Sequence, residues 1–211
     1  MKRTNIKDIQ KELGIEGATK INIGCGRHPM KGYINLDIAK EVNPDILVDI
    51  EKEGLPFPDN SIDEIYSSCC LEHIRPQYWS FIMQEIARVS KHKGKLRLVL
   101  PFDSAFQRGH ADQYRVFTWD SFCDHYYDSS EVLYYGNLIL RNLHKRPNII
   151  YRLWYTLFPF MMKGNVIFFE FEIIKDFSDI IGWDKDKKIN RNWDKILKDN
   201  ATFGVNKNAC N

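Results

Sequence analysis

Two glycines and an aspartate near the start of the chain have the residue types and spacing of a ligand-binding turn. Apolar residues lead from Lys20 into Gly24-Cys25-Gly26, and a second short apolar run ends on Asp37. Glycine lets the backbone turn sharply and lets a ligand approach the main chain with no Cβ in the way. A carboxylate after such a turn commonly accepts both hydroxyls of a ribose. Residues 20–37 therefore predict a strand, a glycine turn and a second strand that bind a nucleoside.

The residues after the glycines favour a mononucleoside over a dinucleotide. A dinucleotide site needs a third glycine and an accessible helix N-terminus for the pyrophosphate. Here the turn continues through Arg27-His28-Pro29, and Asp37 follows Gly26 by only eleven positions, which leaves little room for a full helix. An NAD(P)-dependent oxidoreductase on the same kind of sheet is therefore the less favoured alternative.

A second carboxylate follows the next apolar run. Asp49 lies within residues 46–50, and a proline-containing turn follows at residues 55–61. An aspartate just past a third strand can accept a hydrogen bond from the exocyclic amine of adenine. The alternative is that Asp49 only caps a turn.

The sequence Leu71-Glu72-His73 comes at the expected carboxyl end of a fourth strand, at about residues 61–68. In open α/β sheets, ligands bind beyond the carboxyl ends of the strands. His73 has three possible roles: it lines the pocket, it binds a metal together with cysteines 25, 69 and 70, or it caps the next helix with Glu72. The adjacent cysteines and the lack of paired spacing disfavour the metal.

In their order and spacing, these motifs resemble class I S-adenosylmethionine-dependent methyltransferases, especially the small methyltransferase type 11 group. The shared features are the short glycine turn, the approach GYINLD to the ribose carboxylate, the LPF turn and the LEH sequence. Asn22 stands where many relatives have an acidic residue, so a non-catalytic S-adenosylmethionine-binding protein remains an alternative. The resemblance implies contacts to S-adenosylmethionine at Gly24, Cys25, Gly26, Asp37, Asp49, Ile50, Ser67 and Ser68.

The fold implied by the resemblance is α/β, a Rossmann-like doubly wound sheet of seven strands, mostly parallel with an antiparallel last strand. Residues 1–182 are expected to form a single domain with a lid insertion at about 138–165, and residues 183–211 a polar C-terminal tail. Strands are expected at about 20–23, 33–37, 46–50, 61–68, 96–100, 131–135 and 166–174. A helix is expected from Pro76, with an apolar core stripe formed by Trp79, Ile82, Met83, Ile86 and Val89.

The stretch from His110 to Thr118 is similar to a loop that closes over the active site in related type 11 enzymes. Histidine is the natural proton acceptor at neutral pH. His110 is therefore the first choice for a general base, with Asp103 or Asp112 to orient it, although a surface histidine in a polar loop is the plainer interpretation. The expected substrate contacts are His73, Asp112 and Arg115.

The stretch from Val132 to Phe169 contains no acidic residue, and its basic residues are interleaved with aliphatic and aromatic ones. Such a segment could contact a membrane surface or an anionic acceptor, or it could be a lid whose aromatic side chains pack on the sheet. The sequence Phe158-Pro159 followed by FFEFEIIK resembles methyltransferases linked to cell-surface polysaccharide pathways.

Composition sets the remaining expectations. The 211 residues are 44% hydrophobic with a net charge of +2, which fits a globular protein and gives no reason to expect nucleic acid as a partner. Five cysteines without C-x-x-C spacing indicate reduced thiols and a cytoplasmic location. The expected reaction is in-line transfer of a methyl group from S-adenosylmethionine to an acceptor, with a hydroxyl of a sugar, glycan or small metabolite as the first choice.

Overall fold

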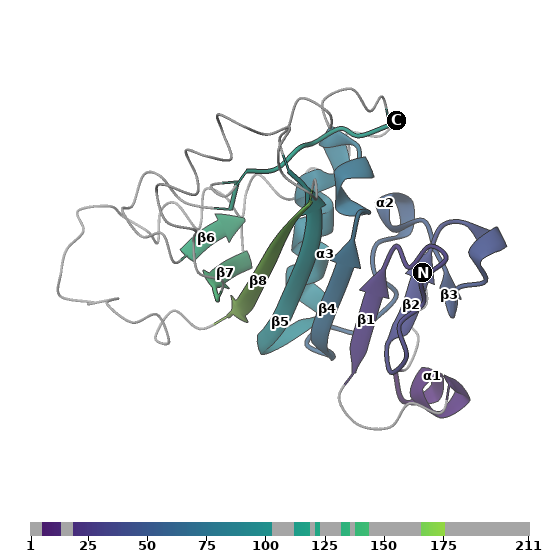
Figure 1. The fold of residues 1–211 in the computed structure, drawn as a ribbon. Helices are drawn as coiled ribbons and strands as arrows, with labels where there is room; N and C mark the ends of the chain where they lie inside the picture. Colours follow the sequence, from purple (N-terminus) through teal and green to yellow (C-terminus); the bar gives the residue numbers. More distant parts are fainter. Residues whose placement is uncertain are drawn as a thin grey trace, which may run out of the picture.

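The computed structural model describes residues 6–13, 19–102, 112–118, 121–122, 132–135, 138–143 and 166–175. Within them, one mixed sheet of eight strands has the order β3-β2-β1-β4-β5-β8-β7-β6 (Figure 1). The first five strands in the chain are β1 (Lys20–Ile23), β2 (Ile34–Asp37), β3 (Ile46–Leu47), β4 (Ile62–Ser68) and β5 (Ser90–Pro101). They are followed by β6 (Val132–Tyr135), β7 (Leu138–Asn142) and β8 (Val166–Ile174).

The strands from β3 to β5 in the sheet are parallel, and the other three run alternately antiparallel. The helices are α1 (Ile6–Leu13), α2 (Ile50–Glu53) and α3 (Trp79–Val89), with 3-10 turns η1 (Lys40–Val42), η2 (Leu71–His73) and η3 (Pro76–Tyr78). None of the helices in the described ranges is long and apolar enough to cross a membrane. The mostly parallel sheet with an antiparallel strand beside β5 confirms the Rossmann-like arrangement expected from the sequence.

The number of strands differs from the prediction of seven, because β7 lies inside the stretch expected to be an insertion. Residues of β7 pair with β8 in the antiparallel register Ile139↔Ile174 and Arg141↔Glu172, and Leu140 is fully buried. This part of the predicted lid is therefore a strand of the sheet, held by a buried leucine. Residues 144–165, where the rest of the lid and the predicted membrane contact would lie, are outside the described residues, as is the predicted tail.

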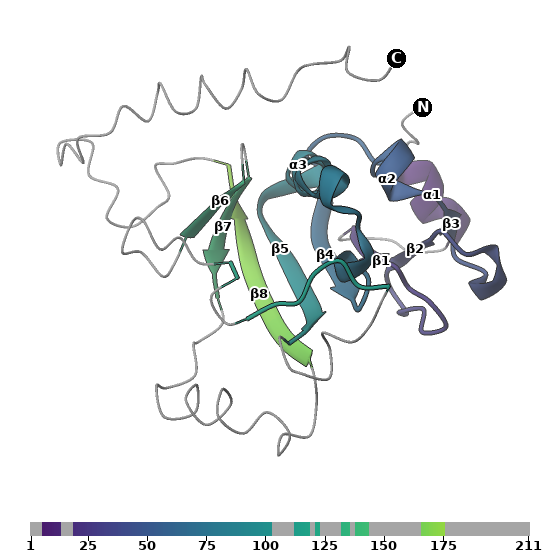
Figure 2. The same ribbon diagram turned by 90° about the horizontal axis from the view of Figure 1, so that it is seen from above.

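The strand order reverses between β1 and β4. From β1 the chain moves outward to β2 and β3, and it then returns past β1 to form β4 and β5. Because crossover connections between parallel strands are right-handed, the β3–β4 and β4–β5 connections should lie on the same face of the sheet. Figure 2 shows α2 and α3 on one side of the sheet, as this rule requires. The carboxyl ends of β1 and β4 therefore flank the position where ligands bind in such sheets.

The core lies between the sheet and α3. All five residues of the predicted apolar stripe on α3 are buried, which confirms that prediction. They pack against the inward-facing side chains of the central strands, such as Ile65, Leu98 and Phe171. An aromatic cluster continues this core toward β8, with ring centroids of Phe122 and Phe169 4.9 Å apart.

The opposite face of the sheet is polar. A row of side chains crosses it from Lys20 through Glu64 and Arg97 to Glu170, with ion-pair distances of 3.2, 2.7 and 3.2 Å. The β1–β2 connection that would cover this face contains turns and no helix, as the short glycine-to-aspartate spacing predicts. In the described part of the chain, helices therefore cover one face only, and the expectation of a doubly wound sheet is not met there. The alternation of apolar and charged residues along β4, β5 and β8 is typical of a sheet with one hydrated face.

Candidate active site

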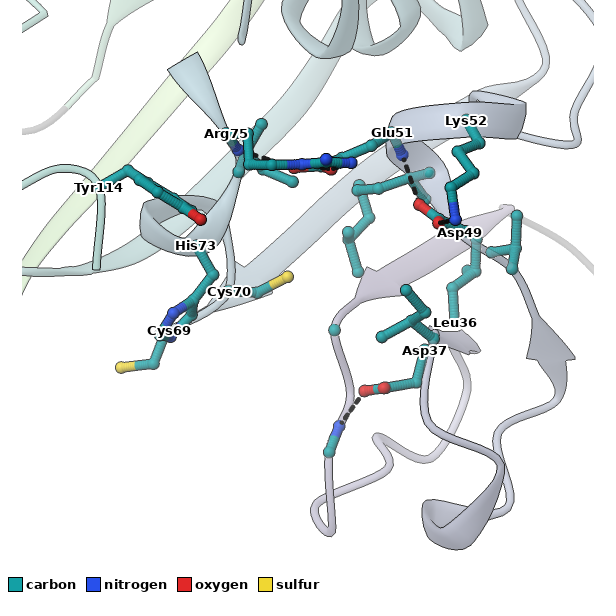
Figure 3. Close-up of a pocket in the computed structure, with 17 residues that line it drawn as sticks. Leu36, Asp37, Asp49, Glu51, Lys52, Cys69, Cys70, His73, Arg75 and Tyr114 are labelled. Carbon is teal, nitrogen blue, oxygen red and sulfur yellow. Dashed lines mark hydrogen bonds and ion pairs between the residues drawn. The ribbon is translucent and has the colours of Figure 1, made fainter. Parts of the chain in front are cut away.

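A cavity of about 640 Å³ opens at the carboxyl ends of β1, β2 and β4, where the strand order reverses (Figure 3). Cys69, His73 and Tyr114 lie on one side of it, and Asp49 and Lys52 lie on the other. The residues that line it are Ile23, Gly24, Gly26, Leu36, Asp37, Ile38, Val48, Asp49, Ile50, Glu51, Lys52, Cys69, Cys70, His73, Ile74, Arg75 and Tyr114.

The glycine turn is fastened to the end of β2. The backbone amides of Gly24 and Cys25 both donate to the carbonyl oxygen of Leu36, at 2.9 and 3.0 Å. The amide of Gly26 donates to Oδ2 of Asp37 at 2.8 Å. Gly24 and Gly26 have φ values of +70° and +51°, a backbone region that side chains with a Cβ rarely adopt. The turn and the carboxylate therefore form one unit that is positioned before any ligand arrives.

The carboxylate of Asp37 retains acceptor capacity toward the cavity. Its Oδ1 accepts a hydrogen bond from the amide of Ala39 at 2.9 Å, so each oxygen accepts one bond from the backbone. A carboxylate has about four lone-pair positions. Two neighbouring hydroxyl groups, such as those of a ribose, can therefore still donate to this side chain.

Asp49 lines the cavity and also caps a helix, which is the second of the two roles considered from the sequence. Its Oδ1 accepts from the amide of Glu51 at 3.2 Å at the start of α2. Its Oδ2 is 2.8 Å from Nζ of Lys52, and the hydrogen bond from Lys52 lowers the pKa of Asp49. The carboxylate is therefore ionised near neutral pH and is an acceptor only.

Apolar side chains flank these two carboxylates. Ile50 follows Asp49, and Ile38 follows Asp37. Ile38 is 66% exposed although it lines the cavity, which is unusual for a large aliphatic residue that serves only the core. The two isoleucines thus offer apolar surface to a flat ring beside the carboxylates.

An ion pair joins the two sides of the cavity. The amide and Nε of Arg75 donate to the two carboxylate oxygens of Glu51 at 2.7 and 2.6 Å. The guanidinium of Arg75 also lies 4.7 Å from the ring centroid of Tyr78. Because Glu51 is on α2 and Arg75 follows η2, this pair links the wall that carries Asp49 to the wall that carries His73.

The segment 112–118 docks against η2 and completes the His73 side. The amide of Tyr114 donates to the carbonyl of Glu72 at 2.9 Å, and the carbonyl oxygen of Asp112 lies 2.7 Å from Nδ1 of His73. Arg115 donates to the carbonyl of Ile74 at 2.8 Å and lies 4.4 Å from the ring centroid of Trp79. Asp112 and Arg115, predicted as substrate contacts, do not line the cavity but hold the segment that brings Tyr114 to it.

Glu72 is a buried acid behind this wall. Its side chain is 1% exposed, and its Oε2 has no hydrogen-bond partner among the described residues. Burial raises the pKa of the Glu72 carboxyl because the charged form loses its hydration.

Most of the residues that the sequence predicted to bind the cofactor line the cavity, and residues that were not predicted line it as well. Six predicted site residues line it: Gly24, Gly26, Asp37, Asp49, Ile50 and His73. Cys25 and Ser67 are buried outside the lining, with Ser67 Oγ donating to the carbonyl of Ile23 at 3.1 Å, and Ser68 is also absent from it. His110 and Asp103, the predicted catalytic residues, lie outside the described residues.

The lining residues not predicted from the sequence include Ile38, Glu51, Lys52, Cys69, Arg75 and Tyr114. Among these residues, a local sequence pattern could have indicated only Lys52, because it follows Asp49 by three positions and can pair with it. Within the described ranges, no group of three or more His, Cys, Asp or Glu residues is arranged to hold a metal ion.

Residues 29–98 match the family model of a methyltransferase domain, Methyltransf_11. The match is about a third of the chain and runs from β2 to most of β5. The chain is an S-adenosylmethionine-dependent methyltransferase. In this enzyme the matched residues include Asp37, Asp49 and His73, and the glycine turn lies just before the matched stretch.

Solved structures resemble the methyltransferase distantly. A SAM-dependent methyltransferase from Archaeoglobus fulgidus is 11% identical with a TM-score of 0.49, over 81% of this chain and 96% of that one. A complex of the Haloferax volcanii Trm112 activator with a methyltransferase gives 14% identity and a TM-score of 0.47, over 80% and 88% of the two chains. A Burkholderia thailandensis 1,6-didemethyltoxoflavin-N1-methyltransferase gives 12% identity and a TM-score of 0.44, over 80% and 76%. No curated protein matches the chain.

Replacing Gly24 by alanine should destabilise the fold more than replacing Gly26. A Cβ on Gly24 would overlap the side chain of Cys70, whereas a Cβ on Gly26 would meet nothing within 4 Å. Both variants incur the cost of a positive φ, about 1–2 kcal/mol, and Gly24→Ala adds about 1–3 kcal/mol of overpacking. Urea unfolding of the two variants measures the difference. Equal losses would show that Cys70 is not packed against the turn.

The Glu72→Gln variant should be more stable than the wild type at pH 7.5 and nearly equal to it at pH 4.5. Because the folded protein raises the pKa of Glu72, it loses stability as the pH rises above the ordinary glutamate range through the raised value. Glutamine has no charge to bury. Thermal unfolding at both pH values, with the exposed Glu41→Gln variant as control, measures the effect. A constant difference at both pH values would contradict it.

Proposed function

We propose that this enzyme transfers the methyl group of S-adenosylmethionine to a hydroxyl group of a sugar, glycan or small metabolite. The observation that carries the proposal is the cavity at the strand reversal, which has a carboxylate and aliphatic wall on one side and a histidine and tyrosine wall on the other. The first wall suits a nucleoside and the second suits a polar acceptor.

The nucleoside side would bind S-adenosylmethionine through Asp37, Asp49 and the two isoleucines. The ribose hydroxyls would donate to Asp37, whose orientation is fixed by the amides of Gly26 and Ala39. The adenine ring would lie against Ile38 and Ile50, and its exocyclic amine would donate to Asp49. Each part of the nucleoside would then meet a group of matching chemistry within one cavity.

The reaction requires the protein mainly to align the acceptor oxygen with the methyl group. The acceptor oxygen attacks the methyl carbon, a C–O bond forms, and the C–S bond breaks with its electron pair going to sulfur. S-adenosylmethionine supplies the reactive carbon and the leaving group, so the protein contributes binding, orientation and exclusion of water. A hydroxyl acceptor also has to lose its proton, which requires a base in the cavity.

A sugar acceptor is supported by Tyr114 and by the sequence of the last strand. Tyr114 is 53% exposed at the cavity, and its amphipathic ring offers an apolar face together with a hydroxyl group. The sequence FFEFEIIK at the end of β8 resembles methyltransferases of cell-surface polysaccharide pathways. Glycans and their precursors are therefore the first acceptors to try.

The proposal predicts that Asp37 variants lose cofactor affinity in a graded order. Asp37→Asn keeps one acceptor oxygen and Asp37→Ala keeps none. Losing hydrogen bonds to a charged group costs about 1.5–3 kcal/mol, so Asp37→Ala should weaken S-adenosylmethionine binding by roughly 10- to 150-fold, with Asp37→Asn between it and the wild type. Calorimetric titration measures the three affinities, and the exposed Lys40→Ala variant is the control.

Turnover is measured in parallel as S-adenosylhomocysteine release with methyl glycosides, nucleotide sugars and simple amines. Methylated sugar from the wild type supports the proposal. Methylation of the amines alone would contradict the hydroxyl acceptor. Tight binding of S-adenosylmethionine with no turnover on any acceptor would favour the alternative of a non-catalytic binding protein.

A further inference from the structure

The carboxylates of the cavity are poor candidates for the base that a hydroxyl acceptor needs. Asp49 is paired with Lys52, which lowers its pKa, and both oxygens of Glu51 are occupied by Arg75. Asp37 accepts two backbone amides and faces the ribose side. Among the described lining residues, His73 is the only histidine.

The hydrogen bond to Asp112 decides which nitrogen of His73 carries the proton. Nδ1 lies 2.7 Å from the carbonyl oxygen of Asp112. A carbonyl oxygen only accepts hydrogen bonds, so Nδ1 must be the donor. In the neutral imidazole the lone pair is then on Nε2. Nε2 makes no hydrogen bond with the described residues, and the side chain is 39% exposed.

Two carboxyl groups lie near the ring of His73. Oδ2 of Asp112 is 3.7 Å from Nδ1, on the side away from the lone pair. Oε1 of Glu72 is 4.0 Å from Nε2. The neighbouring thiol of Cys69 has a raised pKa because of burial, so it stays neutral and does not compete as a base near pH 7.

We propose that His73 is the general base of the methyl transfer, oriented by the carbonyl of Asp112 and accepting the acceptor's proton on Nε2. The inference rests on the proposed function. As the acceptor oxygen bonds to the methyl carbon and sulfur takes the electrons of the C–S bond, the hydroxyl proton passes to Nε2. The resulting imidazolium returns this proton to solvent. The sequence prediction gave this role to His110.

The matched variant is His73→Asn. The asparagine amide can still donate to the Asp112 carbonyl, so the docking of segment 112–118 is retained, but the base is lost. S-adenosylmethionine affinity should stay within about threefold of the wild type. The turnover number with a hydroxyl acceptor should fall by about 10²- to 10⁴-fold, the usual contribution of general base catalysis. Imidazole added to His73→Ala should restore part of the turnover, and the exposed His28→Asn variant should behave as the wild type.

A second readout needs no acceptor. ¹⁵N NMR of histidine-labelled protein in complex with S-adenosylhomocysteine should show His73 protonated on Nδ1 and unprotonated on Nε2. An Nε2–H tautomer, or a His73→Asn variant with wild-type turnover, would overturn the assignment. A wild type that does not bind S-adenosylmethionine, or that methylates only amines, would instead contradict the proposed function, so the two failures are distinguishable.

Discussion

The attachment of the glycine turn to the end of β2 is the constraint on which the cofactor side of the site depends. Two amides of the turn share the Leu36 carbonyl, and a third reaches the Asp37 carboxylate. These bonds satisfy backbone groups that would otherwise be left unpaired beyond the carboxyl ends of β1 and β2. They also fix the orientation of the one side chain best suited to a ribose. The same contacts therefore serve folding and binding, and Cys70 packs so closely behind Gly24 that a side chain there has no space.

The short β1–β2 connection has a second consequence, for the sheet as a whole. It leaves one face without a helix in the described part of the chain, and that face carries the row of ion-paired residues that includes Glu64 and Arg97. The hydrophobic core is confined to the face under α2 and α3. Both helices lead into walls of the cavity, because Asp49 caps α2 and the segment before α3 carries His73 and Arg75. Packing on one face thus positions both halves of the site.

Local patterns in the sequence predicted the parts of the structure that depend on local chemistry. The bounds of β1 and β8, the α3 stripe and the place of Asp37 followed from apolar runs, glycine spacing and strand ends. The Glu51–Arg75 pair and the approach of Tyr114 to Glu72 join residues 24 and 42 positions apart, and no local pattern marks such contacts. The alternation of charged residues in β4 and β5 is a local signal for a one-sided sheet, but the prediction of a doubly wound fold followed the family resemblance and did not use it. The strand β7 was missed because its basic and aromatic surroundings indicated an insertion.

The most direct test of the account is a crystal structure of the protein with S-adenosylhomocysteine. The account predicts the ribose hydroxyls on the carboxylate of Asp37, the adenine ring between Ile38 and Ile50, and the sulfur directed toward the wall that carries Cys69 and His73. A nucleoside bound elsewhere, or bound in this cavity with its ribose away from Asp37, would contradict it.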